Sequence, residues 1–169
     1  MPELPEVEVV KKSLENKLKN LTIKRVNITN NKLRYKIDSK LFSKIKSQKI
    51  ISIQRRSKYL LINLTKNSTI LAHLGMTGKF FVIDNNKKHK TSFYYALKKN
   101  DSKHDHITFF FNKKIKLIYN DVRRFGFIKI YSNKSVLNSE HLAALGPEPL
   151  SSNFNLSYFD KYILNKKKN

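Results

Sequence analysis

The first eight residues of the chain, Met-Pro-Glu-Leu-Pro-Glu-Val-Glu, place an amine beside several carboxylates. If Met1 is removed, Pro2 becomes a secondary amine at the chain end, and part of it is unprotonated because α-amino groups titrate near neutral pH. Such an amine can act as a nucleophile and form a Schiff base with a sugar aldehyde. Glu3 is adjacent and Glu6 follows one helical turn later on the same side, so both carboxylates could move protons at that amine.

The same segment also has the features of a helix start, which needs no catalytic role. Proline is favoured in the first helical turn, and glutamate there interacts well with the helix dipole. Val7, Val10, Leu14 and Leu18 recur at the spacing of an apolar helix face and predict a helix over residues 3–19. The catalytic interpretation therefore depends on the rest of the chain.

Two turn segments carry side chains that suit contact with a nucleic acid. Lys58 lies at the junction of two apolar strands, where a long cation could reach a phosphate or a reacting sugar, although a solvated hairpin lysine has the same pattern. Met76 lies between Gly75 and Gly78 at a predicted tight turn. It is either exposed for a purpose or folded back into the core, and the pattern leaves both open.

A third turn presents Arg123, Arg124 and Phe125 between two predicted strands. Proteins that extrude a nucleotide from a duplex fill the gap with apolar or aromatic side chains, beside arginines that bind phosphate. Met76, Arg123 and Phe125 meet that requirement.

Two histidines, His104 and His106, are predicted on one face of a strand and could indicate a metal site. No third ligand is evident nearby, which favours histidines that contact phosphate or their own surroundings. The chain contains no cysteine, which excludes disulfides, iron–sulfur clusters and cysteine-based zinc sites. We therefore predict no metal ligands in this sequence.

The chain is strongly basic, with 35 Lys+Arg against 12 Asp+Glu, a net charge of +23 and a pI of about 10.2. Such a charge implies a polyanionic partner, above all nucleic acid, bound with steep salt dependence. Part of it lies in lysine runs, such as residues 87–90 and 166–168, that also suit a solvated surface. No apolar run reaches the roughly 18 residues of a membrane span, and the acidic start differs from a signal peptide, so we expect a cytoplasmic protein without membrane contact.

After residue 19 the apolar pattern changes to period two and predicts eight strands in one domain. The predicted fold is mostly β with α: an N-terminal helix packed on a two-sheet antiparallel β-sandwich or flattened barrel. We expect a loop over residues 85–105 with one short strand at 93–97, and a short helix over 139–145. The predicted strands cover residues 22–29, 49–56, 59–65, 69–74, 79–84, 106–112, 115–119 and 127–132.

Six motifs, in this order, resemble those of the bacterial formamidopyrimidine-DNA glycosylases. The resemblance extends over essentially the whole chain and is closer than that to the endonuclease VIII relatives, which share the Pro-Glu start. The motifs are PELPEVE at 2–8, QRRSKYLL at 54–61, HLGMTG at 73–78, KHDH at 103–106, DVRRFG at 121–126 and LGPEPLSSNF at 145–154.

The resemblance implies base-excision repair of oxidised purines, chiefly 8-oxoguanine and formamidopyrimidines, by a monomeric DNA glycosylase and AP lyase. By motif match, Pro2 would attack the sugar C1′ and form a Schiff base, after which β,δ-elimination would follow. Glu3 would be its acid/base partner and Glu6 a second carboxylate that supports proton transfer. Lys58 would bind the phosphate beside the lesion and serve the elimination steps.

The implied partner is damaged double-stranded DNA. His104 would hold the DNA backbone, while Met76, Arg123 and Phe125 would occupy the void left by the extruded nucleotide. Within the terminal lysine run, Lys167 corresponds to a DNA-contacting lysine of the family.

The family continues into a helix-two-turn-helix domain and a four-cysteine zinc finger, which holds its structural zinc. This chain stops near the start of that region and has no cysteine, so the resemblance implies a truncated product with no cofactor. We divide it into an N-terminal catalytic domain, residues 1–150, and the start of the helix-two-turn-helix region, residues 151–169. Two functions stay open: a glycosylase and lyase weakened in DNA binding, or a catalytically silent, basic DNA-binding remnant.

Overall fold

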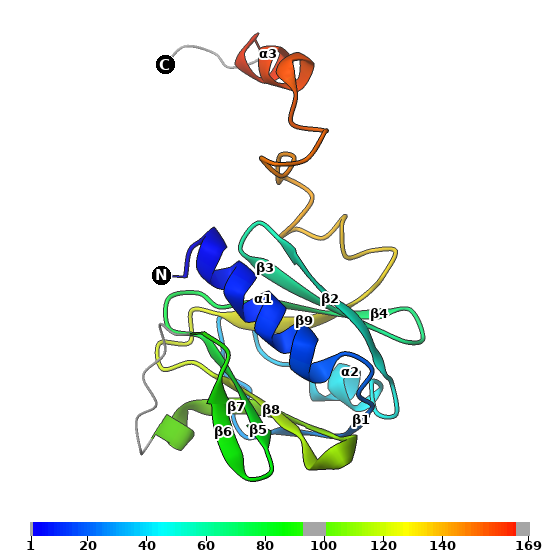
Figure 1. Ribbon diagram of the computed structural model, residues 1–169, viewed down its shortest axis with the longest axis vertical. Helices are drawn as coiled ribbons and strands as arrows, with labels where there is room; N and C mark the ends of the chain where they lie inside the picture. The colour runs from blue at the N-terminus through cyan, green and yellow to red at the C-terminus, as the bar shows by residue number, and fades with distance from the viewer. Residues whose placement is uncertain (1, 93–100, 165–169) are drawn as a thin grey trace.

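Two antiparallel sheets form a sandwich, and helix α1 (Leu4–Leu18) lies along one open side of it (Figure 1). The computed structural model describes residues 2–92 and 101–164. The strand order is β1-β7-β8-β5-β6 in the five-stranded sheet and β2-β3-β4-β9 in the four-stranded sheet. The strands are β1 (Ile23–Ile28), β2 (Ile50–Arg56), β3 (Tyr59–Leu64), β4 (Ser68–His73), β5 (Lys79–Asp84), β6 (Lys87–Lys90), β7 (Asp105–Phe111), β8 (Lys116–Asn120) and β9 (Phe127–Ser132).

The predicted fold class is confirmed, in its sandwich form. An isolated bridge between Thr22 and Lys49 joins the beginnings of edge strands β1 and β2, but the two sheets do not pair along their strands and so do not close into a barrel. All eight predicted strands are present, each to within one residue at either end. Short runs of β-branched, aromatic and other apolar residues, bounded by turn residues, predict strands well because such side chains must be buried on at least one face of a sheet.

Helix α1 forms because its first turn is capped and one of its faces is apolar. Glu3 occupies the N-cap position, and its backbone N–H donates to Glu6 Oε2 over 2.9 Å, which is half of a capping box. The apolar face packs mainly against β2 and also reaches β3 and β5, so the helix seals the core between the sheets. The residues of that face, none more than 1% exposed, are Val7, Val10, Leu14 and Leu18.

The four-stranded sheet is covered on both faces. Its inner face joins the main core, while Leu61, Leu71 and Phe127 on its outer face form a second cluster with Val136 and Leu142. This double burial explains why β3 and β4 read as nearly continuous apolar runs.

The segment after β5 differs from its prediction. Residues 87–90 were expected in a loop but form strand β6, which pairs with β5 in a hairpin. Asn85 and Asn86 connect the two strands with φ of 47° and 62°, as a tight two-residue hairpin turn requires. The all-polar sequence of β6 concealed it, because an edge strand needs no apolar face. The strand predicted at 93–97 lies outside the described residues.

The predicted helix over residues 139–145 is wrong. The segment forms successive turns, in which the Leu142 N–H donates to the Ser139 carbonyl and the Leu145 N–H donates to the Leu142 carbonyl. These turns place Leu142 on the outer face of the four-stranded sheet, so packing outweighs local helix propensity. Short helical segments that were not predicted are α2 (Ser39–Ser43), η1 (Asp101–His104) and η2 (Asn112–Lys114).

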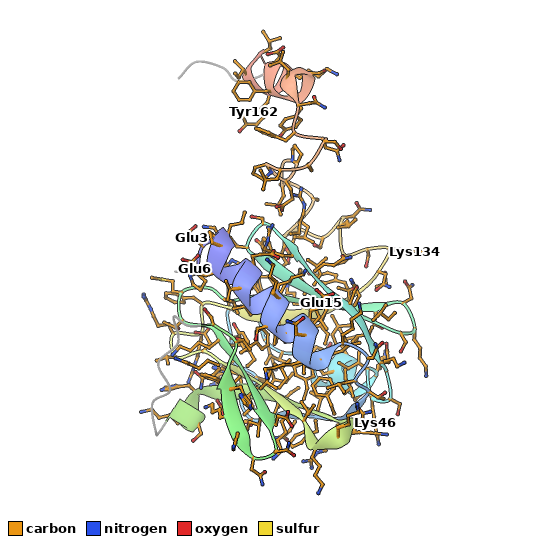
Figure 2. All side chains as sticks on the ribbon, in the orientation of Figure 1. Glu3, Glu6, Glu15, Lys46, Lys134 and Tyr162 are labelled. Carbon is orange, nitrogen blue, oxygen red and sulfur yellow. The ribbon has the colours of Figure 1, made fainter. Side chains whose placement is uncertain are left out.

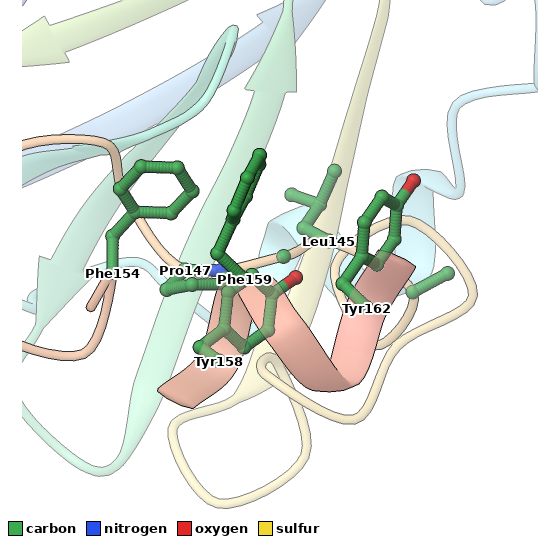
Figure 3. Close-up of a pocket in the computed structure, with 8 residues that line it drawn as sticks. Leu145, Pro147, Phe154, Tyr158, Phe159 and Tyr162 are labelled. Carbon is green, nitrogen blue, oxygen red and sulfur yellow. The ribbon is translucent and has the colours of Figure 1, made fainter. Parts of the chain in front are cut away.

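Beyond residue 150 the chain leads to helix α3 (Leu156–Leu164), which stands apart from the sandwich (Figure 1). A pocket of about 530 Å³ separates it from residues 144–147, lined by aromatic side chains that include Phe154, Tyr158 and Tyr162 (Figure 3). No described helix is long and apolar enough to cross a membrane. Large apolar residues exposed by 44% or more in this part of the chain are Leu150, Phe154, Leu156, Phe159, Tyr162, Ile163 and Leu164.

Substitution of Leu14 by alanine tests whether α1 seals the core. Leu14 has no exposed surface, and Leu14→Ala should lower the free energy of unfolding by about 2–5 kcal/mol through lost burial and a residual cavity. Chemical denaturation measures this. The matched control is Asn16→Ala on the exposed face of the same helix, which should change stability by less than about 0.5 kcal/mol. Similar losses in both variants would contradict the assignment.

Candidate active site and nucleic-acid interface

Strand register brings the predicted site segments to one end of the sandwich. His73, the last residue of β4, pairs with Tyr59 at the start of β3 and with Phe127 at the start of β9. The turn before β3, the loop after β4 and the loop before β9 therefore leave neighbouring strands at the same end. These are three of the segments that the sequence singles out.

The predicted catalytic residues meet where this end of the sandwich approaches α1. Lys58 Nζ lies 2.5 Å from Glu3 Oε2, although the two residues are distant in sequence. Glu3 and Glu6 lie at the same end of α1 (Figure 2), and Pro2 is half-buried beside them. The side chains of Lys58 and Glu3 are 31% and 54% exposed, so the pair stays open to a ligand. Lys58 is thus not an isolated solvated lysine.

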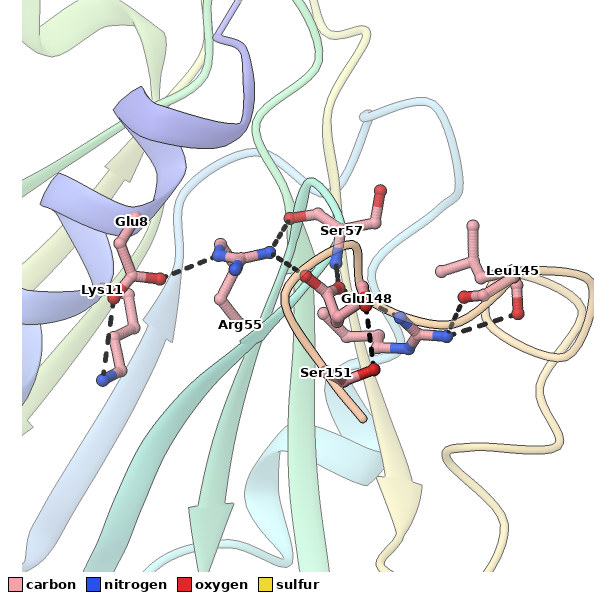
Figure 4. A network of polar contacts seen from close by, with 9 residues as sticks. Glu8, Lys11, Arg55, Ser57, Leu145, Glu148 and Ser151 are labelled. Atoms are coloured by element: carbon pink, nitrogen blue, oxygen red, sulfur yellow. Dashed lines mark hydrogen bonds and ion pairs between the residues drawn. The ribbon is translucent and has the colours of Figure 1, made fainter. Parts of the chain in front are cut away.

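A polar network fixes the Lys58 turn to α1 and to the segment before α3 (Figure 4). Arg55 Nε donates to Glu8 Oε2 over 2.8 Å, and Arg55 Nη1 donates to Glu148 Oε2 over 3.0 Å. Arg56 Nη1 donates to Glu148 Oε1 over 3.0 Å. The backbone N–H of Ser57, in the turn itself, donates to the same oxygen over 2.6 Å. One carboxylate thereby holds both the end of β2 and the turn itself.

Glu148 is ionised in this setting. Partial burial favours its neutral form, but the hydrogen bonds from the Ser57 N–H, Arg55 and Arg56 outweigh burial and hold the pKa of Glu148 below its ordinary value. Burial likewise opposes the charge of Arg55, and its bonds to Glu8 and Glu148 outweigh that cost and raise the pKa of Arg55.

The three residues predicted to fill a gap in DNA lie together in the loops at this end. Met76 and Phe125 are 42% and 46% exposed, so Met76 does not fold back into the core. The Arg123 guanidinium lies 4.6 Å from the centre of the Phe125 ring. Together with Arg34 and His73, they line a pocket of about 480 Å³. The arrangement presents apolar tips beside cations, as insertion into a base stack requires.

Asp121 holds these two loops together. It is fully buried, its Oδ1 accepts the Thr77 hydroxyl over 2.5 Å, and its Oδ2 accepts the Gly126 N–H over 2.8 Å. Thr77 Oγ1 also accepts the Arg123 N–H over 3.0 Å. A side chain at Gly75 would lie only 2.5 Å from the Gly126 nitrogen, so glycine there lets the loops approach closely.

The two histidines of the KHDH motif have different environments. They do not share one strand face, because β7 begins at Asp105 and His104 belongs to η1. His106 is buried, with ring nitrogens 3.2 Å from the Asn30 carbonyl oxygen and 2.9 Å from the Asp121 carbonyl oxygen. Both ring nitrogens of His106 are thus within hydrogen-bond distance of backbone carbonyl groups of the protein itself. His104, by contrast, is half-buried. Within residues 2–92 and 101–164, no three His, Cys, Asp or Glu form a group that could hold a metal.

The electrostatic field at this end is positive. His73 Nδ1 accepts the Gly75 N–H over 3.1 Å, which needs the neutral ring. Burial, followed by the nearby charges of Arg34 and Lys58, lowers the pKa of His73. The groups that would meet a DNA backbone are therefore cationic.

Sequence reasoning missed three residues of this site: Arg34, Asp121 and Glu148. The signal for the two acids was present, because each stands inside a quoted motif of a chain with only 12 acidic residues. Arg34 lies in an irregular segment without a pattern. Lys167 lies outside the described residues, so its DNA contact stays a prediction.

Removal of the Thr77 hydroxyl should loosen both loops. Thr77→Val deprives buried Asp121 of a donor and the Arg123 N–H of an acceptor, so stability should fall by about 1–3 kcal/mol. Hydrogen exchange of the amides in residues 121–126 should accelerate. Thr77→Ser keeps the hydroxyl and should exchange at the native rate. Equally slow exchange in both variants would show that this contact does not hold the loops.

Glu148→Gln should weaken the fold in a pH-dependent manner. Because the folded-state pKa is lowered, the carboxylate stabilises the protein above its ordinary pKa, and this stabilisation is lost as pH falls through the lowered value. The variant should be less stable by about 1–3 kcal/mol at neutral pH. Denaturation curves at neutral pH and in acid should show the difference shrinking in acid. Asp160→Asn, which alters an exposed carboxylate on α3, is the control; a difference independent of pH would contradict the network.

Comparison with known proteins agrees with this geometry. The family model described as the formamidopyrimidine-DNA glycosylase N-terminal domain matches residues 1–128. The formamidopyrimidine-DNA glycosylase of Rickettsia bellii (strain OSU 85-389) is 42% identical over 167 residues, which are 99% of this chain and 56% of that protein. The corresponding protein of Wolbachia pipientis (strain wPip) is 36% identical, over 100% of this chain and 57% of its own length. The chain thus spans a little more than half the length of these relatives.

Solved structures show the same fold. The Lactococcus lactis Fpg in complex with DNA containing an abasic site superposes with a TM-score of 0.78 at 28% identity. The match covers 97% of this chain and 57% of that protein. A complex of the same enzyme with DNA containing N7-benzyl-Fapy-dG gives a TM-score of 0.77 at 29% identity. Matched over its whole sandwich in both sequence and structure, the chain belongs to the formamidopyrimidine-DNA glycosylase family.

Proposed function

We propose that this chain carries the catalytic machinery of a base-excision repair glycosylase and AP lyase that acts on oxidised purines, chiefly 8-oxoguanine and formamidopyrimidines. The observation that carries the proposal is the Glu3–Lys58 ion pair at the N-terminus of α1. It puts an acid and a cation beside Pro2, which becomes the chain-terminal amine if Met1 is removed. These three groups are the minimum set for iminium chemistry on a sugar.

In the proposed reaction, the Pro2 nitrogen bonds to C1′ of the damaged nucleotide while the bond from C1′ to the base breaks. Glu3 exchanges protons with the reacting sugar, and Glu6, whose Oε2 already accepts the Glu3 N–H, supports that exchange. The Pro2 nitrogen then loses its proton, the C1′–O4′ bond breaks with a proton delivered to O4′, and an iminium ion forms between Pro2 and C1′. This iminium ion permits β,δ-elimination of the two phosphates. Lys58 binds phosphate beside the lesion and serves those eliminations.

Damaged double-stranded DNA is the proposed partner. Met76, Arg123 and Phe125 would enter the space left by an extruded nucleotide, and His104 would contact the backbone. The complexes of the Lactococcus lactis enzyme with lesion DNA support this, as does the net charge of +23. We further propose that the chain acts as a monomer in the cytoplasm.

The alternative is a basic DNA-binding protein without turnover. One observation favours it: the matches cover 56–57% of the relatives' length, so the activity of the whole relatives does not by itself extend to the shared part. Loss of several phosphate contacts lowers affinity by powers of ten at physiological salt.

Borohydride trapping separates the two functions. Duplex DNA with an abasic site, incubated with the chain and borohydride at low salt, should give a covalent adduct. Borohydride reduces the iminium ion between Pro2 and C1′ to a stable amine. An uncleavable N-terminal extension should abolish the adduct, and peptide mass mapping should locate it on Pro2. Pro5→Ala, which alters the other proline of the first turn, should leave trapping intact.

The competing outcome is equally specific. If the chain binds the duplex but the native and the N-terminally extended forms yield the same amount of adduct, or none, the chain is the silent DNA-binding protein.

A further inference from the structure

The outer face of the five-stranded sheet carries basic side chains that the proposed reaction does not use. Arg25 on β1 lies opposite Phe110 on β7, which in turn lies opposite Lys116 on β8. Lys116 lies opposite Ile83 on β5, and Ile83 lies opposite Lys88 on β6. Directly opposed residues of antiparallel strands share a face, so these five side chains form one row across the sheet. We call them the basic row.

The three cations of the basic row lie on the face of the sheet opposite the main core, whereas its Ile83 also packs against that core. The residues that alternate with it along the strands, such as Val26, Phe109 and Leu117, belong to or pack on the main core. Arg25 is exposed, and Lys88 and Lys116 are half-buried. The next row on the same face adds Lys90 and, like the basic row, contains no acid, but its Phe81 and Ile118 are buried and belong to the main core cluster. Its members are Asn27, Thr108, Ile118, Phe81 and Lys90.

Aromatic rings, and not carboxylates, hold these cations. The Arg25 guanidinium lies 4.2 Å from the centre of the Phe110 ring, and Lys116 Nζ lies 5.5 Å from the same centre. Lys88 Nζ lies 4.0 Å from the centre of the Phe81 ring. None of the ion pairs found in residues 2–92 and 101–164 involves Arg25, Lys88 or Lys116. Their charges are therefore positioned but not neutralised.

The spacing of the three cations suits a polyanion. They occupy alternate strands and so lie about 10 Å apart across the sheet. That separation is close to the screening length of physiological salt, roughly 8 Å, so they repel one another unless an anion binds. A single small anion cannot span them, whereas a chain of phosphates can.

The basic row is separate from the candidate active site. Lys79 begins β5 next to that site, whereas Ile83 and its neighbours in the row lie four residues further along, about 14 Å away on an extended strand. They also lie on the outer face of the sheet, whereas the site lies at the ends of its strands. A duplex at the site would leave the row free for another segment.

We propose that the basic row is a second DNA-binding surface, which binds the phosphate backbone of a duplex segment other than the one at the candidate active site. Binding there is independent of sequence, since the row consists of long cations that can reach phosphates and no side chain that reads bases. A chain with two such surfaces can hold one segment while it samples another.

Binding stoichiometry tests this proposal without any catalytic step. Analytical ultracentrifugation at low salt, with a short undamaged duplex in excess, should find two duplexes on the native chain. The variant R25Q/K88Q/K116Q should bind one. The log–log salt slope for binding should also become shallower by about 2 to 3, since each neutralised phosphate contributes roughly 0.9.

Three controls make the result decisive. K12Q/K17Q/K19Q removes the same charge from α1 and should keep two duplexes, as should the charge-conserving R25K/K88R/K116R. Lys88→Glu on edge strand β6 leaves the Phe110 stack untouched and should lose the second duplex even if the triple variant folds poorly, which thermal melting would reveal. One duplex on the native chain, or equal losses in the row and α1 variants, would overturn the proposal and leave the row as charges that protect sheet edges.

Discussion

The pairing of His73 with Tyr59 on one side and Phe127 on the other decides where the chemistry of this protein can occur. A shift of either register by one residue would move the adjoining loop and exchange the side chains that face the two hydrophobic clusters on either side of the sheet. Because both neighbours are fixed at the same residue, three connections open at one end of the sandwich. The N-terminus of α1 reaches that end because its apolar face is committed to the core.

Only a small part of the site consists of groups that would touch a ligand. Asp121 and Glu148 both act on backbone N–H groups and neighbouring side chains of turns, so each fixes the shape of a loop whose tip is free. A buried or half-buried carboxylate suits this work, since it accepts several hydrogen bonds at once and its charge makes each one stronger. In this basic chain, Asp121 and Glu148 therefore stabilise loops and do not themselves face a ligand.

Much of this could be predicted from the sequence, and the failures have physical causes. The eight apolar strands were predictable because each must bury one face at least. The proposed catalytic set of Pro2, Glu3 and Lys58 followed only from the family resemblance, because each residue alone also suits a helix start or a hairpin turn. Strand β6 escaped because an edge strand can be wholly polar. The turns at 139–145 escaped because contact with the sheet, and not local preference, shapes them. The hydrogen-bonding roles of Asp121 and Glu148 depend on partners that only the folded chain brings near.

The exposed apolar surface of α3 bears on how long the chain survives in a cell. Chaperones and proteases select chains by accessible apolar segments, and a helix that presents Leu156, Ile163 and Leu164 to solvent offers one while the sandwich stays folded. The amount of this protein in a cell would then depend on how well α3 is covered, and not on the unfolding equilibrium of the core. A protein can in this way be thermodynamically sound and still be short-lived.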